Sequence, residues 1–122
     1  MLSTETWINK VNSNQQLVQR GSRITLTFTF GIENKDFLIN IINGEINSIK
    51  KRILLTDSGV FRIHGSKECW DRHWLKVPPR DFHDIFAMLA KNIITIDGDL
   101  LPLMQNLQYF KDLIASNRMS NI

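Results

Sequence analysis

The alternation of apolar and polar residues between positions 22 and 30 constrains the fold of this chain more than any other feature. A repeat of two residues is typical of a β-strand with one buried face and one solvated face. The apolar positions are Ile24, Leu26, Phe28 and Phe30, and the polar ones are Arg23, Thr25, Thr27 and Thr29. We therefore expect a sheet in which this segment is the best-defined strand.

Further strands are expected at residues 37–42, 45–49 and 60–65. Asn43 and Gly44 stand between the first two of these, and both residues accept the positive φ angles of a two-residue hairpin. Residues 52–56 are a candidate edge strand, followed by a turn over residues 56–59. The pattern predicts four antiparallel strands before the second helical segment.

Residue patterns typical of helices precede and follow these strands in the sequence. Ser3 and Thr4 are suitable N-caps for a helix that ends before Gly21, and its Asn and Gln content suggests that it packs on the outside. Ser66 is suited to cap a short helix over residues 67–74, which Pro78 and Pro79 would end.

Two more helices are expected in the second half of the chain. Asp81 is suited to cap a helix whose apolar stripe is Phe82, Ile85, Phe86 and Leu89. A short strand over residues 93–96 follows, and Asp99 is then expected to cap one last helix. The stripe of that helix is Leu100, Leu103, Leu107, Phe110 and Ile114, widened by Met104 and Leu113.

The order of elements predicts an α+β fold, α-β-β-β-β-α-α-β-α, with a five-stranded, mostly antiparallel sheet covered on one face by helices. Because a helical crossover precedes the last strand, we expect that strand to pair parallel to a neighbour. With 122 residues the chain has the length of one domain. We expect that domain to span residues 1–122, with a helix in residues 1–21 and a frayed tail in residues 117–122.

A series of short motifs indicates a family. In order, they are the Asn43-Gly44 hairpin, Phe61-Arg62-Ile63, Ser66-x-Glu68-x-Trp70, Phe82-His83-Asp84-Ile85-x-Ala87-Met88, and Ile94-x-Ile96-x-Gly98-Asp99 followed by Leu103 and Leu107. The segment from Phe28 to Ser116 resembles the sterol carrier protein 2 family of lipid-binding domains. The resemblance implies a five-stranded sheet covered by helices, with an apolar tunnel between them. That tunnel would hold a fatty acid, a sterol or a similar lipid, without catalytic residues.

The residues themselves favour the same function. Large aromatic and Met side chains fill irregular gaps and can leave a deformable apolar cavity between helices and sheet. We predict that the ligand-binding residues are Phe28, Phe30, Trp74, Phe82, Phe86, Leu89, Leu103, Met104, Leu107 and Phe110. The last helix or residues 70–79 would move to admit the ligand. A plain core has the same composition, so an interaction module that scaffolds a partner enzyme is one alternative.

Two tryptophans and a group of basic residues are expected near the entrance of the predicted binding site. Trp70 and Trp74 are four residues apart, and they would line a portal, stack on a ring-shaped ligand or anchor their helix. Cationic side chains nearby would form a basic rim for a carboxylate or phosphate headgroup, or for an anionic membrane surface during ligand exchange. They are Lys67, Arg72, Lys76 and Arg80.

Nucleic acid is not an expected partner. The net charge is +3 and the pI is about 9.2, and the only basic run is Lys50-Lys51-Arg52. A nucleic-acid-binding domain usually concentrates more charge on one face. No stretch approaches the roughly 20 apolar residues of a transmembrane helix. We therefore expect a hydrophobic small molecule as the main partner, with the protein a monomer or a dimer.

Metal, cofactor and enzyme chemistry are not expected either. Cys69 and His73 share a helix face, but a zinc site needs three or four ligands. Asp97-Gly98-Asp99 is better explained as a turn and an N-cap than as a calcium loop. Cys69 is the only cysteine, which fits a cytoplasmic location. The remaining alternative is a small enzyme that uses His73 or His83 on a lipid-like substrate.

Overall fold

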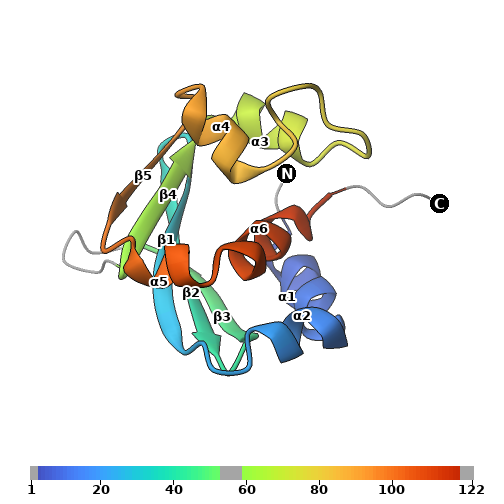
Figure 1. The fold of residues 1–122 in the computed structure, drawn as a ribbon, viewed down its shortest axis with the longest axis vertical. Helices are drawn as coiled ribbons and strands as arrows, with labels where there is room; N and C mark the ends of the chain where they lie inside the picture. The colour runs from blue at the N-terminus through green and yellow to red at the C-terminus, as the bar shows by residue number, and fades with distance from the viewer. Residues whose placement is uncertain (1–2, 53–58, 119–122) are drawn as a thin grey trace.

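The computed structural model describes residues 3–52 and 59–118. The described part folds as an α+β domain around one five-stranded sheet, with strand order β3-β2-β1-β4-β5. The strands are β1 (Leu26–Ile32), β2 (Lys35–Ile42), β3 (Glu45–Lys51), β4 (Phe61–Gly65) and β5 (Ile94–Gly98). The helices are α1 (Thr4–Asn12), α2 (Gln15–Arg20), α3 (Lys67–His73), α4 (Ile85–Ala90), α5 (Leu101–Gln105) and α6 (Leu107–Ala115). In Figure 1 the strands lie on the left and most helices on the right.

The antiparallel meander of β1, β2 and β3 confirms the strand and hairpin predictions. Phe30 pairs with Phe37 across β1 and β2, and Ile42 pairs with Glu45 across the tight turn. In that turn Asn43 has a φ of 51° and Gly44 a φ of 84°. Positive φ at both positions matches the twist of the two strands, so the turn fixes their register.

The expected position of the parallel pair was wrong. β4 pairs parallel to β1, with Phe30 opposite Ile63, whereas β5 pairs antiparallel to β4. Four antiparallel strands in a row were also wrong, because β4 runs beside the central strand β1 and not beside β3. The candidate edge strand and turn over residues 52–59 fall mostly outside the described residues.

Both terminal helices are divided at an asparagine, where one continuous helix was expected. Asn14 ends the first segment and caps α2, since its side chain accepts a hydrogen bond from the Leu17 N–H at 3.2 Å. Asn106, with a φ of −128°, separates α5 from α6. The first segment lies on the outside as expected, since Glu5, Asn9 and Lys10 are exposed and only its stripe of Trp7 and Val11 is fully buried.

The cap of α4 also differs from the expectation. Asp84 is the N-cap, and its side chain accepts hydrogen bonds from the Phe86 and Ala87 N–H groups at 2.8 Å. Asp81 has a φ of 72°, which is not the extended conformation of an N-cap residue. The helix therefore starts three residues later than predicted, and Phe82 precedes it.

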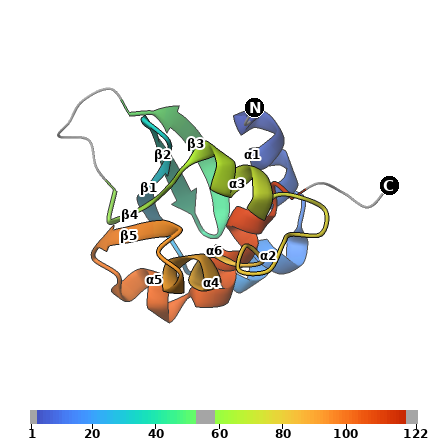
Figure 2. The same ribbon diagram turned by 90° about the horizontal axis from the view of Figure 1, so that it is seen from above.

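Helices cover one face of the sheet, and the two views agree that α1, α3 and α6 lie on the same side of it (Figures 1 and 2). Aromatic side chains fill the interface between these layers. The ring of Phe30 lies 5.2 Å from that of Trp7 and 4.6 Å from that of Trp70. The ring of Phe28 lies 5.6 Å from that of Phe110.

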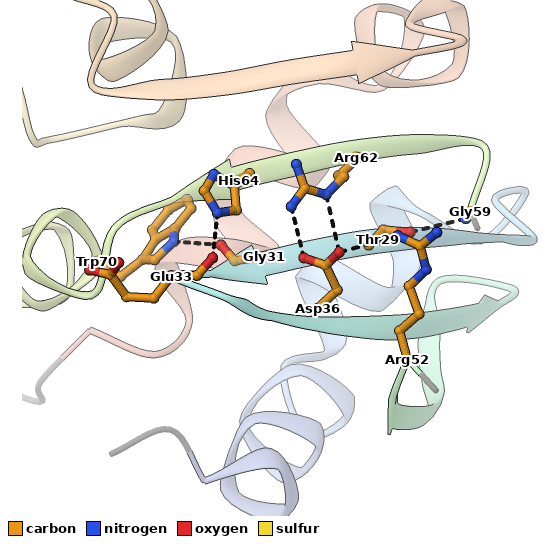
Figure 3. A network of polar contacts seen from close by, with 9 residues as sticks. All are labelled: Thr29, Gly31, Glu33, Asp36, Arg52, Gly59, Arg62, His64 and Trp70. Atoms are coloured by element: carbon orange, nitrogen blue, oxygen red, sulfur yellow. Dashed lines mark hydrogen bonds and ion pairs between the residues drawn. The ribbon is translucent and has the colours of Figure 1, made fainter. Parts of the chain in front are cut away.

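Polar side chains from neighbouring strands form a network across the sheet (Figure 3). A carboxylate oxygen of Asp36 on β2 lies 2.9 Å from the Arg62 guanidinium on β4, and the other lies 3.2 Å from that of Arg52. The Gly59 N–H donates to the Thr29 hydroxyl at 3.0 Å. These contacts tie the segments on either side of residues 53–58 to the central strands.

Candidate binding groove

A groove of about 530 Å³ lies where α1, the β1–β2 turn, α3 and the residues after α6 meet. Its volume is within the range of small-molecule sites. Four separate segments of the chain contribute to it. The lining residues are Ser3, Thr6, Lys10, Ile32, Glu33, Asn34, Lys35, Phe37, Lys67, Trp70, Asp71, Trp74 and Asn117.

Helical periodicity places two sets of these residues on the groove. Ser3, Thr6 and Lys10 lie at intervals of three and four on α1 and its cap, so they share one helix face. On α3 and its C-cap the corresponding residues are Lys67, Trp70, Asp71 and Trp74. The groove is thus bounded by one face of each helix, and the β1–β2 turn supplies a third side.

Stacked indole rings form the apolar wall of the groove. The ring centroids of Trp70 and Trp74 are 5.7 Å apart, with an angle of 23° between their planes. Trp70 donates its indole N–H to the Gly31 carbonyl at 3.1 Å (Figure 3), and Trp74 donates its own to the Ile114 carbonyl at 2.8 Å. Because both N–H groups are occupied and Trp70 is fully buried behind Trp74, the partly buried ring of Trp74 is the apolar indole surface that the groove offers to a ligand.

Cationic and polar groups stand around this wall. Lys10 and Lys35 make no side-chain hydrogen bond or ion pair with any residue that the structure describes. Lys67 is different, because its ammonium lies 2.8 Å from the Asp71 carboxylate, and this hydrogen bond raises the pKa of Lys67. Asn117 adds a side-chain NH₂ that is buried and has no partner among the described residues. The groove therefore offers free donors and positive charge beside an apolar wall.

The predicted ligand-binding residues are distributed over three places. Trp74 lines the groove, and Phe82 lines a second pocket of about 190 Å³ with Cys69 and Arg72. The other eight line neither of these two pockets. Fully or almost fully buried are Phe28, Phe30, Leu103 and Phe110; partly buried are Phe86, Leu89 and Leu107; and Met104 is exposed.

Between the sheet and α6, aromatic rings occupy the region in which the tunnel was expected. Phe28, Phe61 and Phe110 contact one another with centroid distances of 5.2 to 5.6 Å. The hollow described above lies toward the ends of α1 and α3. Contact between a bound ligand and the eight predicted residues outside the two pockets stays a prediction.

The structure supports two of the three roles considered for the paired tryptophans, since Trp70 and Trp74 both anchor their segment and line the groove. Of the basic residues expected at a rim, only Lys67 lines the groove. Arg72 forms an ion pair with Glu68 at 2.6 Å and lies over the Phe82 ring. Lys76 and Arg80 lie in the loop between α3 and α4.

The sequence analysis missed the groove residues on α1 and on the β1–β2 turn. Lys10 and Lys35 are ordinary surface lysines in the sequence, and only the fold brings them to the same site. The one available signal was the polar face of the first helix, opposite Trp7 and Val11.

The titratable residues near α3 are not arranged as a catalytic site. The His73 ring is fully buried, and its Nδ1 lies 2.7 Å from the Phe82 carbonyl oxygen, to which it donates. Burial lowers the pKa of His73 to about 4. His83 is on the surface, with 61% of its side chain exposed. Neither ring lines the groove, and burial raises the pKa of the Cys69 thiol.

The described residues contain no group of three or more His, Cys, Asp or Glu side chains placed to hold a metal ion. None of their helices has both the length and the hydrophobicity needed to cross a bilayer.

Comparison with known proteins identifies the fold. No family model matches the chain, and no curated protein sequence does. Among solved structures, sterol carrier protein 2 aligns with a TM-score of 0.74 and 11% identity, over 96% of this chain and 94% of that one. A Thermus thermophilus protein described as possibly a sterol carrier protein aligns with a TM-score of 0.66 and 12% identity, over 100% and 93%. The ubiquinone synthesis protein UbiJ-SCP2 aligns with 0.60 and 10%, over 91% and 88%. The chain therefore has the sterol carrier protein 2 fold.

Proposed function

We propose that this protein binds and carries one hydrophobic molecule, such as a fatty acid, a sterol or a similar lipid, without acting as an enzyme. The observation that carries the proposal is the partly buried ring of Trp74, stacked on the buried Trp70, beside the ammonium groups of Lys10 and Lys35, which have no partner among the described residues. Such a site suits a ligand with an apolar body and an anionic head. The fold supports the proposal, because its structural neighbours include sterol carrier protein 2.

Apolar contact supplies most of the affinity in this proposal. Burial of a methylene contributes about 0.8 kcal/mol, so ten methylenes contribute roughly 8 kcal/mol before the entropic costs of binding. Lys10 and Lys35 orient the ligand by attracting its carboxylate or phosphate. The NH₂ of Asn117, which has no partner in residues 3–52 and 59–118, donates to an oxygen of the same headgroup.

The tail of the ligand extends from the groove toward the aromatic core. Trp70 and Trp74 contact Phe30, so a chain that displaces these rings reaches the predicted residues beneath α6. In this proposal residues 70–79 or α6 move to admit the tail. Phe28 and Phe110 then exchange their mutual contact for contact with the ligand, which keeps the apolar surface buried.

A carrier fits the chemistry of this site better than an enzyme. His73 is buried with a low pKa, and His83 lies on the surface away from the groove. A hydrophobic ligand held by an apolar wall needs no directional chemistry. We also propose a cytoplasmic location, since the single cysteine is a buried free thiol.

An interaction module is the second candidate function. Leu101 and Met104 on α5 are 61% and 57% exposed, and Leu100 beside them is 38% exposed. Exposed apolar side chains that lie together are typical of a contact surface. One structural neighbour is a ubiquinone synthesis protein, which is compatible with a role beside enzymes of lipid metabolism.

Competition with a fluorescent fatty acid tests the carrier proposal. The paired variant Lys10→Gln/Lys35→Gln should raise the dissociation constant for a fatty acid about tenfold. It should leave the constant for the fatty alcohol of equal length nearly unchanged, because the alcohol has no charge to lose. The matched control is Lys50→Gln/Lys91→Gln, which removes the same charge at two exposed positions outside the groove.

Two results would contradict the proposal. Absence of saturable binding with every lipid class tested would remove the carrier function and favour the interaction module. Equal effects of the groove pair and the control pair would show that the lysines act only through net charge.

A further inference from the structure

The loop between α3 and α4 presents apolar side chains to solvent directly beside the groove. Val77 is 79% exposed, the largest value among the exposed large hydrophobic residues of the described chain, and Leu75 is 40% exposed. The loop begins after Trp74, which lines the groove. In both ribbon views it extends from the helical side of the molecule, away from the sheet (Figures 1 and 2).

Two cations lie close to these apolar positions in the sequence. Lys76 separates Leu75 from Val77, and Arg80 follows the two prolines. Neither side chain makes an ion pair or hydrogen bond with any described residue. Most other basic residues of this region have acidic partners within the chain: Lys67 with Asp71, Arg72 with Glu68, and Lys111 with Asp84.

The backbone holds the loop in a defined shape. The guanidinium of Arg118 donates to the carbonyl oxygens of His73 and His83, at 3.1 and 3.0 Å, so one side chain fixes both ends of the loop. The Phe82 N–H donates to the Pro79 carbonyl at 3.0 Å, and Pro78 and Pro79 restrict φ. A surface prepared in this way loses little conformational entropy when it binds a partner.

We propose that the loop formed by residues 75–80 docks the protein on an anionic bilayer surface. Val77 and Leu75 enter the boundary between headgroups and acyl chains, and Lys76 and Arg80 contact lipid phosphates. Aliphatic side chains that alternate with unpaired cations match such a surface in both polarity and charge. Each basic residue near an anionic leaflet strengthens binding about fivefold.

Docking through this loop would bring the groove to the membrane. Trp74 is both the C-cap of α3 and a wall of the groove, so the docked loop is covalently continuous with the binding site. The benefit for ligand transfer rests on the proposed function. Membrane binding itself does not, because it is measured without a ligand.

Co-sedimentation with vesicles tests this proposal. The wild-type protein, Lys76→Gln/Arg80→Gln and Leu75→Ser/Val77→Ser are mixed with vesicles of phosphatidylcholine alone or with about 30% phosphatidylglycerol. We expect wild-type binding to the anionic vesicles that weakens with added salt, and a loss of at least about tenfold in either variant. The controls are Lys50→Gln/Lys91→Gln for charge and Leu101→Ser/Met104→Ser for exposed apolar surface, and both should bind like the wild type.

The outcomes separate this proposal from the carrier function. In the absence of vesicles, fatty-acid affinity should fall much less than vesicle binding in the loop variants, because residues 75–80 do not line the groove even though part of the loop belongs to the segment proposed to move. Absence of wild-type binding to anionic vesicles would overturn membrane docking and favour a protein partner for the loop. Wild-type levels of binding by both loop variants would also overturn it. Failure of fatty-acid binding alone would overturn only the carrier proposal.

Discussion

The indole N–H of Trp74 donates to the carbonyl oxygen of Ile114 at 2.8 Å, next to the Leu113 carbonyl, which accepts the indole N–H of Trp7 at 2.9 Å. Both carbonyls belong to the last turn of α6, where their backbone donors among the described residues are long contacts, from the Ser116 N–H to Leu113 at 3.4 Å and from the Asn117 N–H to Ile114 at 3.5 Å. The tryptophans thus cap α6 from two other segments. The hydrogen bond from Trp74 to Ile114 therefore joins the wall of the groove to the C-terminal end of α6.

Trp74→Phe should separate the capping role from the binding role. The variant keeps an aromatic ring in the wall but removes the short hydrogen bond to the Ile114 carbonyl, which then keeps only its long backbone contacts, at a cost of roughly 0.5–1.5 kcal/mol. Urea unfolding should show this loss of stability, while fatty-acid affinity should fall less than in Trp74→Ala. Equal affinities of the two variants would show that the ring does not contact the ligand.

Asp36→Asn should destabilise the sheet. Burial alone would raise the pKa of Asp36, but hydrogen bonds and charges from Arg62 and Arg52 outweigh it and lower that pKa below 3.8. Because the folded-state pKa is depressed, this stabilisation is present above about pH 4 and is lost as the pH falls through the folded value. At pH 7 we expect a loss of about 1–3 kcal/mol in the free energy of unfolding.

The pH dependence of that loss provides the control. Unfolding midpoints of wild type and Asp36→Asn should converge as the pH falls through the depressed folded-state pKa, where the carboxylate becomes protonated in both folded and unfolded wild-type chains. A constant difference between about pH 7 and pH 2.5 would contradict the role assigned to the ion pairs.

His73 should make the protein less stable in mild acid. Desolvation lowers the pKa of His73 from 6.5 to about 4, so the unfolded chain binds a proton more readily between these values. Stability is therefore full above about pH 6.5 and decreases as the pH falls, by about 2 kcal/mol between pH 7.5 and pH 5. His73→Asn keeps a donor for the Phe82 carbonyl but does not titrate.

The measurement is urea unfolding of wild type and His73→Asn at about pH 7.5 and pH 5. We expect the variant to be less stable at the higher pH and to lose about 2 kcal/mol less on acidification. An unchanged dependence on pH would show that other groups govern the acid response.

Gly44→Ala should destabilise the fold by more than about 2 kcal/mol. Gly44 has a φ of 84°, and a Cβ atom there would lie 2.5 Å from the Val18 carbonyl oxygen. The carbonyl of Gly44 also accepts the Tyr109 hydroxyl at 2.7 Å, so a shift of the turn would break that bond. Thermal unfolding should detect the loss, and Asn43→Gly, which accepts positive φ at the neighbouring position, should shift the midpoint far less.

Local patterns predicted the parts of the fold that depend on local chemistry. The strand at β1 and the positive φ angles of Asn43 and Gly44 are properties of neighbouring residues, and the structure confirms both. The solvated face predicted for β1 was wrong at Thr29, which is buried. Strand partners across the sheet depend on the whole chain, so the parallel pair was assigned to β5 instead of β4. Asp81 and Asp84 both precede an apolar stripe, and only the backbone conformation at Asp81 decides between them.

Fewer residues of the candidate site than of the fold could be predicted, because the site also depends on contacts between residues far apart in the sequence. Trp70 and Trp74 were recognised because their spacing on one helix is local. Lys10 and Lys35 lie 25 positions apart, and no periodicity connects them. Phe28 and Phe110 were expected at a cavity because regularly spaced aromatic residues on a strand or a helix look alike in a filled core and in a binding site.

The clustering of the aromatic core has a practical consequence for spectroscopy. The three tryptophans of the chain form one group, with Trp7 6.3 Å from Trp74 and Trp74 5.7 Å from Trp70. Intrinsic indole emission therefore originates entirely from the corner where α1, α3 and the end of α6 meet. A change in its wavelength or lifetime reports on that corner alone, without any attached dye.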